Sequence, residues 1–254
     1  MVLEKFSLSG KTALIIGASR GLGQGMARAL AEAGADVALV ARTVSSLEEF
    51  AEEIKGLHRK CLILPSDVSQ PSETQAMVNR VIEAFGKIDI LINSQGTQVR
   101  KPALEMTEQD WDGLMSVNLK SVFFSCQAVG REMVKQGKGK IINVASLSSV
   151  IGLPNISIYG ASKGGVAQLT KALAVEWAPY RINVNAVLPG YYKTTLTADL
   201  FKNEERAKWV ISRIPLGRTG LPEDLAGTVV FLSSEASDYI TGQIIPVDGG
   251  WLSS

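Results

Sequence analysis

The residue types best suited to chemistry gather in the stretch Tyr159–Lys163, with Ser146 thirteen positions before the tyrosine. Tyr159 and Lys163 are four residues apart, so on a helix they lie on one face, one turn apart. A tyrosine hydroxyl with its ordinary pKa near ~10 is a poor base at neutral pH, and a nearby ammonium lowers that pKa by favouring the phenolate. The pair is therefore a candidate proton donor and acceptor. An exposed lysine beside an inward-packed tyrosine would show the same spacing.

Composition argues against several other kinds of site. The chain has 254 residues, with 26 Lys and Arg against 25 Asp and Glu, so we expect no overall basic field for nucleic acid. The single histidine, His58, lies in a polar run and is expected in a solvated loop, which argues against a Ser-His-Asp triad. Cys61 and Cys126 lie in apolar runs and are expected to be core thiols of a reducing compartment. Two cysteines and one histidine are too few for a Cys/His zinc cluster, so no metal is expected.

The N-terminal residues and the apolar runs carry no targeting or membrane signal. Residues 1–10 include charges and lack an apolar stretch long enough for a signal peptide. No run approaches the ~20 apolar residues of a membrane span. We therefore expect a cytoplasmic protein with no membrane partner.

Short apolar runs, separated by amphipathic segments, predict the elements that would position the reactive residues. Buried strands are expected at 12–16, 37–40, 61–64, 88–92, 140–144, 182–187 and 243–247. Helices are expected at 22–33, 45–55, 71–85, 107–118, 121–136, 157–177 and 223–233. This alternation predicts an α/β fold with a single domain over residues 1–254. Its core would be a Rossmann-type doubly wound parallel sheet of about seven strands with helices on both faces.

A glycine-rich turn follows the first predicted strand. Gly17, Gly21 and Gly23 have the spacing GxxxGxG, which differs from the standard dinucleotide fingerprint. Glycines let the backbone turn sharply and bring amide groups close to a pyrophosphate at the positive end of the next helix. The turn therefore indicates a dinucleotide site, although a strand-to-helix turn that needs glycine only for its dihedral angles is an alternative.

The end of the second predicted strand bears on the choice of cofactor. An NAD site usually presents an acidic residue there, but this chain has Arg42 between Ala41 and Thr43. Arg20, in the glycine-rich turn, approaches the same adenosine ribose from the other side. Either guanidinium could pair with a 2′-phosphate, so the two together favour NADP(H) over NAD(H).

Further motifs in register give the chain a resemblance to the short-chain dehydrogenase/reductase family over nearly its whole length. Besides the glycine-rich turn and the Ser-Tyr-Lys set, these motifs are Asp67-Val68, Asn93-Ser-Gln-Gly96, Ser116-Val-Asn118-Leu, Pro189-Gly190 with Thr194, and Val247-Asp-Gly-Gly250. Ser94-Gln95 departs from the small Asn-Ala pair of the family. The backbone behind the adenine is therefore expected to differ slightly.

The resemblance implies a role for each site residue. Ser146 would hydrogen-bond the substrate oxygen, and Tyr159 would give or take its proton. Lys163 would lower the tyrosine pKa and bind the nicotinamide ribose, and Asn118 would position a water that connects Lys163 to solvent. Hydride would pass between the nicotinamide and the substrate carbon. The implied NADP(H) contacts are Gly17, Ser19, Arg20, Gly21, Leu22, Gly23, Arg42, Asp67, Val68, Asn93, Gly96, Tyr159, Lys163, Pro189, Gly190, Tyr192 and Thr194.

The substrate, a small alcohol or carbonyl compound, is less closely defined. The resemblance is greatest to family members that act on sugar acids such as gluconate, but β-ketoacyl-carrier-protein reductases share most of the framework. A general carbonyl reductase is a related alternative. An NADP(H)-binding regulator without turnover is a more distant one, because the Ser-Tyr-Lys-Asn set is intact.

The two main substrate classes need different surroundings. A sugar acid needs a fixed cation and several hydroxyl partners. Arg100, in the loop after the fourth predicted strand, could hold its carboxylate bidentately, or could be an ordinary loop charge. Candidate hydroxyl partners are Ser146, Asn155 and Tyr191. An acyl chain on a carrier protein would need a basic docking patch, which Arg131, Lys135, Lys138 and Lys140 could form.

Two further expectations concern a lid and the assembly. The polar segment 194–214 is expected to be a mobile lid over the substrate, unless it is a rigid helical hairpin against a neighbouring subunit. The helical segments 123–133 and 166–177 carry apolar residues on more than one face. By resemblance, we expect a homotetramer in which segment 243–251 makes the second interface.

Overall fold

The computed structural model describes residues 1–194 and 197–254. Within these residues, seven parallel strands form a sheet in the order β3-β2-β1-β4-β5-β6-β7. Their bounds are β1 Thr12–Ile16, β2 Asp36–Ala41, β3 Cys61–Pro65, β4 Ile90–Asn93, β5 Gly139–Val144, β6 Ile182–Pro189 and β7 Ile244–Val247. The predicted Rossmann-type doubly wound sheet is confirmed, with each strand close to its predicted position.

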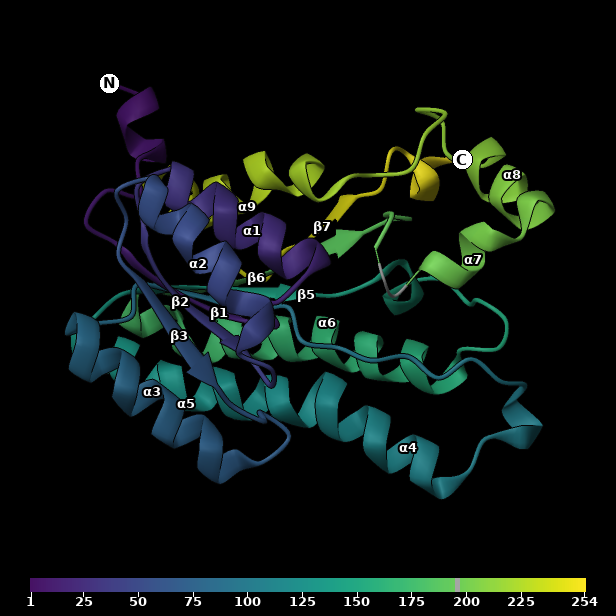
Figure 1. The fold of residues 1–254 in the computed structure, drawn as a ribbon, viewed down its shortest axis with the longest axis horizontal. Helices are drawn as coiled ribbons and strands as arrows, with labels where there is room; N and C mark the ends of the chain where they lie inside the picture. Colours follow the sequence, from purple (N-terminus) through teal and green to yellow (C-terminus); the bar gives the residue numbers. More distant parts are fainter. Residues whose placement is uncertain (195–196) are drawn as a thin grey trace.

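Helices cover both faces of the sheet (Figure 1). One face carries α1 (Gly21–Glu32), α2 (Ser45–Gly56) and α9 (Ala226–Ser233), and the other carries α3 (Pro71–Phe85), α5 (Ser121–Gln136) and α6 (Ser157–Trp177). Each face has its own apolar cluster, built around Met26 and Leu30 on the first and Met77 and Val129 on the second. A strand such as β1 is buried on both sides, which is why its sequence is an unbroken apolar run. None of the described helices is long and apolar enough to cross a membrane.

The strand order reverses at β1 and β4, which are neighbours in the sheet. In open α/β sheets, ligands bind beyond the carboxyl ends of the strands at such a point, because connections that leave to opposite faces open a crevice. The glycine-rich turn follows β1 and the Asn93–Gly96 loop follows β4. The fold therefore brings these two motifs together.

The segment before α5 is continuous with it. Helix α4 (Glu108–Met115) begins at a capping box of Thr107 and Asp110, and a π-helical turn, Ser116–Lys120, joins it to α5. The sequence predicted two helices with a break after Asn118, so the π-helical turn is a correction. π-Helical turns are rare in proteins, and those that occur are often at functional sites.

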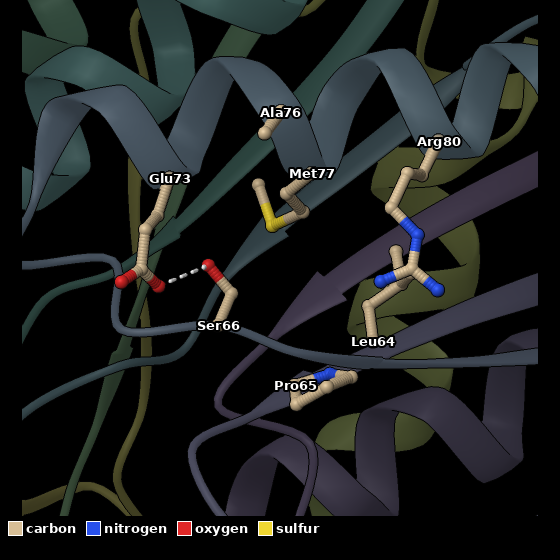
Figure 2. Close-up of a pocket in the computed structure, with 7 residues that line it drawn as sticks. All are labelled: Leu64, Pro65, Ser66, Glu73, Ala76, Met77 and Arg80. Atoms are coloured by element: carbon tan, nitrogen blue, oxygen red, sulfur yellow. Dashed lines mark hydrogen bonds between the residues drawn. The ribbon is translucent and has the colours of Figure 1, made fainter.

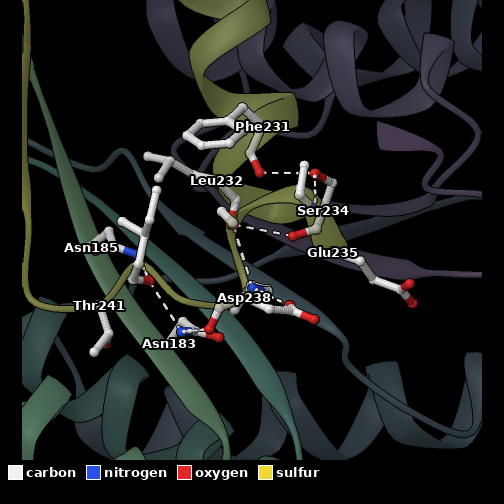
Figure 3. Close-up of polar contacts among 12 residues, drawn as sticks. Asn183, Asn185, Phe231, Leu232, Ser234, Glu235, Asp238 and Thr241 are labelled. Carbon is white, nitrogen blue, oxygen red and sulfur yellow. Dashed lines mark hydrogen bonds and ion pairs between the residues drawn. The ribbon is translucent and has the colours of Figure 1, made fainter. Parts of the chain in front are cut away.

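Polar residues inside β6 fix the connection to β7 (Figure 3). Asn183 donates to the backbone carbonyls of Asp238 and Ile240 at 3.1 and 3.0 Å, and Asn185 donates to that of Ile240 at 3.0 Å. The side-chain oxygen of Asn185 accepts from the Gln243 amide at 3.0 Å. A buried backbone group left without a partner would cost ~1–3 kcal/mol, so these bonds stabilise β7 at the edge of the sheet.

The predicted lid contains two short helices, α7 (Ala198–Lys202) and α8 (Glu204–Ser212), and its residues 195–196 lie outside the described part of the chain. The last turn of α8 is anchored: Val210 and Ile214 are buried in a cluster with Ala145, Leu147 and Trp251. In Figure 1, α8 lies beside the C-terminus. Movement of the whole segment would have to break this packing, and the lid over 194–214 stays a prediction.

Candidate active site

The hydroxyl groups of Ser146 and Tyr159 lie close enough to interact where the end of β5 approaches the first turn of α6. Ser146 follows β5 and caps the 3-10 turn Leu147–Ser149, and its hydroxyl oxygen accepts from the Ser148 amide at 3.3 Å. Tyr159 lies in the first turn of α6 and is partly buried. Two fixed hydroxyl groups side by side can hold one substrate oxygen between them and exchange a proton with it.

The surroundings of Tyr159 shift the pKa of its hydroxyl group. Burial raises the pKa of Tyr159, and the hydrogen bond with Ser146 offsets this shift only in part. The ammonium of Lys163 donates to the Val144 backbone carbonyl at 2.7 Å. The cost of desolvating the phenolate dominates this shift, and the lowering of the tyrosine pKa by Lys163 stays a prediction.

Lys163 is a buried cation. The residue is 4% exposed, and its ammonium has no carboxylate partner among the described residues. Burial lowers the pKa of Lys163 to about 8, because a low-dielectric surrounding disfavours the ammonium. A Cβ placed on Gly96 would lie 3.6 Å from both Lys163 Nζ and Asn118 Oδ1, so these two groups face the loop after β4. A perturbed lysine beside a crevice is a feature typical of functional sites.

Asn118 connects three elements through its side chain. It is fully buried in the π-helical turn, and its oxygen accepts from the Thr97 amide at 2.8 Å. Its amide donates to the Thr97 carbonyl at 2.9 Å and to Ser162 Oγ on α6 at 3.2 Å. The structure therefore brings Asn118, Ser146, Tyr159 and Lys163 together at the carboxyl ends of β4 and β5.

The glycine-rich turn has no space for side chains at its tightest points. Gly17 has a φ of 84°, and a Cβ placed on it would lie 2.8 Å from the Gln95 amide nitrogen. A Cβ on Gly23 would lie 2.1 Å from the Gly17 carbonyl oxygen. The amides that begin α1 have no side-chain cap, since Arg20 at the N-cap position makes none. Uncapped amides behind a close backbone approach fit a dinucleotide pyrophosphate.

Two arginines stand beside this turn. The amides of Gly17 and Ala18 donate to the Val40 carbonyl at 2.9 and 3.1 Å, so the turn lies against the end of β2. Arg20 and Arg42 therefore project from adjacent loops. Both are exposed, and neither has an ion pair within residues 1–194 and 197–254. This arrangement fits the 2′-phosphate of NADP(H).

Other predicted cofactor contacts also lie at the carboxyl ends of the strands. Thr194 is close to the glycine-rich turn, since a Cβ on Gly21 would lie 3.5 Å from its side chain. Gly190 is pressed against Asp248, whose Cα would lie 2.7 Å from an added Cβ. The remaining predicted contacts are Ser19 and Leu22 in and after the turn, Asp67 and Val68 after β3, Gly96 after β4, and Pro189 at the end of β6.

Two predicted contacts have side chains that serve the protein core instead. Asn93 donates to Asn143 Oδ1 at 2.8 Å and accepts from Ser125 Oγ at 2.7 Å. The Tyr192 hydroxyl donates to the Val247 carbonyl at 3.0 Å, and its ring is buried. The cofactor contacts at Asn93 and Tyr192 stay predictions, and with these side chains engaged internally we expect them to come from the backbone.

Gln95, the departure from the family motif, points into the protein. It is 6% exposed and donates to Ser121 Oγ at 3.0 Å, and its own side-chain oxygen has no hydrogen-bond partner among the described residues. Ser121 donates to the Val117 carbonyl at 2.6 Å. Gln95 therefore links the loop after β4 to the π-helical turn that carries Asn118.

A cavity of about 220 Å³ between β3 and α3 is separate from these residues (Figure 2). Glu73 lies at one end of it and accepts from the Ser66 hydroxyl at 3.4 Å and the Asp67 amide at 2.6 Å, which fixes the loop after β3. Because β3 is the edge strand and β2, β1 and β4 separate it from β5, the cavity is remote from Tyr159. Its lining residues are Leu64, Pro65, Ser66, Glu73, Ala76, Met77 and Arg80.

The predicted substrate residues lie in the loops after β4 and β6 and in the loop before α6. Tyr191 follows β6 and contacts Trp251, with ring centroids 4.8 Å apart. Asn155 has a φ of 64°, and its carbonyl accepts from the Lys101 amide at 3.0 Å, which ties the loop before α6 to the loop after β4. Burial lowers the pKa of Arg100, and the positive charge of Arg206 lowers it further.

Sequence reasoning missed Arg206, which lies on α8. The charge of Arg206 also acts on Tyr191, as does that of Arg213. A signal was present, since Arg206 precedes the apolar Val210 by four residues. The polar character of the segment concealed it, because nothing local indicated which face of α8 would turn inward.

The chain matches a protein family described as Enoyl-(Acyl carrier protein) reductase over residues 17–252. It belongs to the short-chain dehydrogenase/reductase family and is an oxidoreductase of that family. The resemblance expected from the motifs is confirmed.

Relatives cover the whole chain. The chain is 48% identical over 253 residues to the 2-dehydro-3-deoxy-D-gluconate 5-dehydrogenase of Dickeya dadantii, and the match covers 99% of each chain. The chain is also 42% identical over 247 residues to the gluconate 5-dehydrogenase of Gluconobacter oxydans, and the match covers 97% of this chain and 96% of the relative. A crystal structure of a gluconate 5-dehydrogenase from Burkholderia cenocepacia in complex with NADP and tartrate has a TM-score of 0.97, at 38% identity and 100% coverage of both chains. The NADP in that relative agrees with the cofactor predicted from Arg20 and Arg42.

Proposed function

We propose that the protein is an NADP(H)-dependent dehydrogenase/reductase that interconverts a secondary alcohol and a ketone on a sugar acid such as gluconate. The observation that carries this proposal is the position of Ser146 and Tyr159, whose hydroxyl groups interact, beside the buried Lys163. The close-packed glycine turn and the unpaired Arg20 and Arg42 support NADP(H), which when bound supplies the hydride donor or acceptor.

Ser146 and Tyr159 would bind the reacting oxygen of the substrate together. Because burial raises the pKa of Tyr159, its hydroxyl is protonated at neutral pH and can donate a proton to the oxygen of a ketone. In the oxidation direction, Tyr159 would take the proton of the alcohol, which a nearby positive charge would favour. Lys163, one turn further along α6, is in position to supply that charge, and its pKa of about 8 lets it exchange a proton near neutral pH.

Three observations support a sugar acid as the substrate class. Arg100 stands by the crevice without an ion pair among the described residues, while the next residue, Lys101, is paired with Asp110 at 2.6 Å. The relatives include a gluconate 5-dehydrogenase and a 2-dehydro-3-deoxy-D-gluconate 5-dehydrogenase, and one related structure holds tartrate, a hydroxylated dicarboxylate. These features share one chemistry, a carboxylate next to hydroxyl groups.

The carrier-protein alternative has less support. Of the four cations that could form its docking patch, Lys135 is paired with Glu132 at 2.7 Å and Lys140 with Asp238 at 2.8 Å. Paired cations attract an acidic partner less strongly than free ones. The β-ketoacyl thioester is therefore the comparison substrate rather than the proposed one.

A comparison of substrates tests the proposal. D-gluconate and 2-dehydro-3-deoxy-D-gluconate would be oxidised with NADP+, and a β-ketoacyl thioester reduced with NADPH, each followed by NADPH absorbance. We expect the higher kcat/KM for a sugar acid. Tyr159→Phe should lower kcat at least ~100-fold while the Kd for NADPH stays within a few-fold, because only the proton exchange is removed. Preference for the thioester would contradict the substrate class, and a fully active Tyr159→Phe variant would contradict the catalytic assignment.

A further inference from the structure

Helix α8 packs directly on the part of the sheet that carries Ser146. Val210, on α8, is 0% exposed and lies in one apolar cluster with Ala145 and Leu147, the two neighbours of Ser146 in the chain. Tyr191 packs against the same cluster. The face of α8 that carries Val210 is therefore the face turned toward the strand end that carries Ser146.

Arg206 lies on that face. It precedes Val210 by four residues, so the two side chains lie one turn apart on the same side of the helix. Asn203 caps the helix, its side-chain oxygen accepting from the Arg206 amide at 2.9 Å, which fixes the first turn. Because side chains of a helix lean toward its N-terminus, the guanidinium extends beyond the buried part of the contact.

Arg206 and Arg100 are both exposed arginines and carry like charges. The charge of Arg206 acts on Arg100, and the charges of both arginines act on Tyr191. Neither has an ion pair within residues 1–194 and 197–254, although neighbouring cations do: Lys101 pairs with Asp110 at 2.6 Å, and Lys208 with Glu204 at 3.8 Å. Repulsion between two guanidinium groups is relieved when one anion lies between them.

A third arginine nearby is already engaged. The guanidinium carbon of Arg213 lies 5.6 Å from the ring centre of Trp209 and 5.1 Å from that of Trp251. Such cation–π contacts stabilise an arginine on aromatic faces. Arg213 therefore forms the wall behind Tyr191, and Arg206 is the cation on α8 that is left for a ligand.

We propose that Arg206 is a second ligand for the substrate carboxylate, opposite Arg100, and that α8 delivers it to the crevice. This inference rests on the proposed sugar-acid function and deepens it by naming a specificity-determining residue. A planar carboxylate has two oxygens that can each accept from one guanidinium group, whereas the hydroxymethyl end of a polyol offers a single oxygen. The enzyme would thereby distinguish sugar acids from uncharged sugars of the same length.

Kinetics of matched variants test the proposal. Arg206→Gln removes the charge and keeps a good helix former, and Lys208→Gln removes a charge from α8 two positions further along, as a control. The substrates are D-gluconate and glucitol, which has an alcohol in place of the carboxylate. With gluconate we expect Arg206→Gln to lower kcat/KM at least tenfold, mainly through KM, and Lys208→Gln to change it less than twofold. The activity with glucitol should hardly change. An unchanged KM for gluconate, or equal losses with both substrates, would overturn the assignment.

A binding measurement separates this inference from the proposed function. Tartrate would be titrated by calorimetry into the enzyme saturated with NADPH, where an alcohol has no hydride acceptor and nothing turns over. We expect Arg206→Gln to raise the Kd for tartrate at least tenfold and Lys208→Gln to leave it within twofold. If the parent enzyme oxidises no sugar acid, the proposed function fails while this result still decides the role of Arg206. Equal Kd values for parent and Arg206→Gln, or no binding of tartrate by the parent, would show that Arg206 holds no carboxylate.

Discussion

At the scale of single residues, the site keeps a cation almost out of water beside a phenol. The Lys163 ammonium has the Val144 carbonyl as its hydrogen-bond acceptor, at 2.7 Å, and no carboxylate partner among the described residues. A carbonyl offsets only part of the lost hydration of a charge, so the ammonium is destabilised relative to the amine. Such a lysine lowers the free energy of unfolding, but its lowered pKa makes it useful for proton exchange.

The stability of the protein should therefore depend on pH through Lys163. Its pKa is about 8 in the folded protein and 10.5 ordinarily. Between these values the unfolded chain binds more protons than the folded one, so the free energy of unfolding rises with pH. Below about pH 8 both states are protonated and the full cost is present, ~3 kcal/mol, and above about pH 10.5 it is gone. We expect this rise in the parent and not in Lys163→Met.

Urea unfolding at a fixed protomer concentration, from neutral pH to about 10.5, measures this difference. Other lysines and tyrosines titrate in the same range, but they are common to both proteins and cancel in the difference. Parallel curves for parent and Lys163→Met would show that the lysine is not destabilised by burial.

The cofactor preference is a second residue-scale prediction. Arg20 and Arg42 are exposed and lack ion pairs among the described residues, so their charges are available to a 2′-phosphate. A hydrogen bond to a charged group contributes ~1.5–3 kcal/mol, or one to two decades in affinity. Arg42→Ala should weaken NADPH by about this amount, and the double variant with Arg20→Ala should weaken it more, while NADH changes little.

Fluorescence titration of both cofactors provides the test, with Arg80→Ala as the control. Arg80 is an exposed cation at the cavity beside β3, where no cofactor contact is predicted. A parent enzyme that binds NADH more tightly than NADPH would refute this interpretation of the ribose pocket.

At the scale of elements, the junction of β1 and α1 is the most constrained part of the cofactor site. A Cβ on Gly23 would lie 2.1 Å from the Gly17 carbonyl oxygen, a backbone atom that cannot swing away as a side chain does. Gly23→Ala should therefore displace the turn, destabilise the protein by ~1–3 kcal/mol and weaken NADPH binding at least ~10-fold.

Gly113→Ala provides the matched control. Gly113 is an exposed residue of α4 with no heavy atom within 4 Å of an added Cβ. Alanine there should stabilise the protein by ~0.5–1 kcal/mol and leave cofactor binding unchanged. Urea unfolding and NADPH titration measure the free energy of unfolding and the Kd for NADPH of both variants. Equal values for Gly23→Ala and Gly113→Ala would show that the turn is not close-packed.

The elements differ in how far the sequence could predict them. Strands such as β1 were predictable because both of their faces are buried, which leaves an unbroken apolar run between turns. The π-helical turn was not predictable, because its Asn118 is held by the backbone of Thr97, in a loop distant in the sequence. The motifs predicted cofactor contacts at Asn93 and Tyr192, but the direction in which a side chain points is set by its neighbours in space. Arg206 was missed for the same reason, since the packing of Val210 orients α8.

At the scale of the whole molecule, one face of the protein keeps large apolar side chains in contact with solvent. Val175 on α6 is 79% exposed, Trp111 on α4 47% and Phe123 on α5 37%. These helices lie on the same side of the sheet (Figure 1). Large apolar side chains that stay exposed on one side of a sheet are candidates for a subunit interface.

The edge of the sheet at β7 is a second candidate interface. No strand pairs with the outer side of β7 within the described residues, and an uncovered edge invites association. Pro246 in this strand lacks an amide hydrogen, so side chains of the terminal segment, rather than a continued hydrogen-bonded ladder, would make the contact. Two different surfaces, each meeting its own copy, generate a tetramer with three perpendicular two-fold axes.

We therefore predict a homotetramer, with a mass in solution four times the 27.2 kDa of the chain. Light scattering coupled to size-exclusion chromatography at micromolar concentration measures it. Phe123→Glu and Val175→Glu each place a carboxylate in the helical interface. Because burying an unpaired carboxylate costs more free energy than the contact contributes, both variants should dissociate to a dimer held by the β7 edge. Leu57→Glu, at the end of α2 on the opposite face and 37% exposed, serves as the control and should keep the parent mass. A monomeric parent would refute the assembly, and a tetrameric Phe123→Glu variant would place the interface elsewhere.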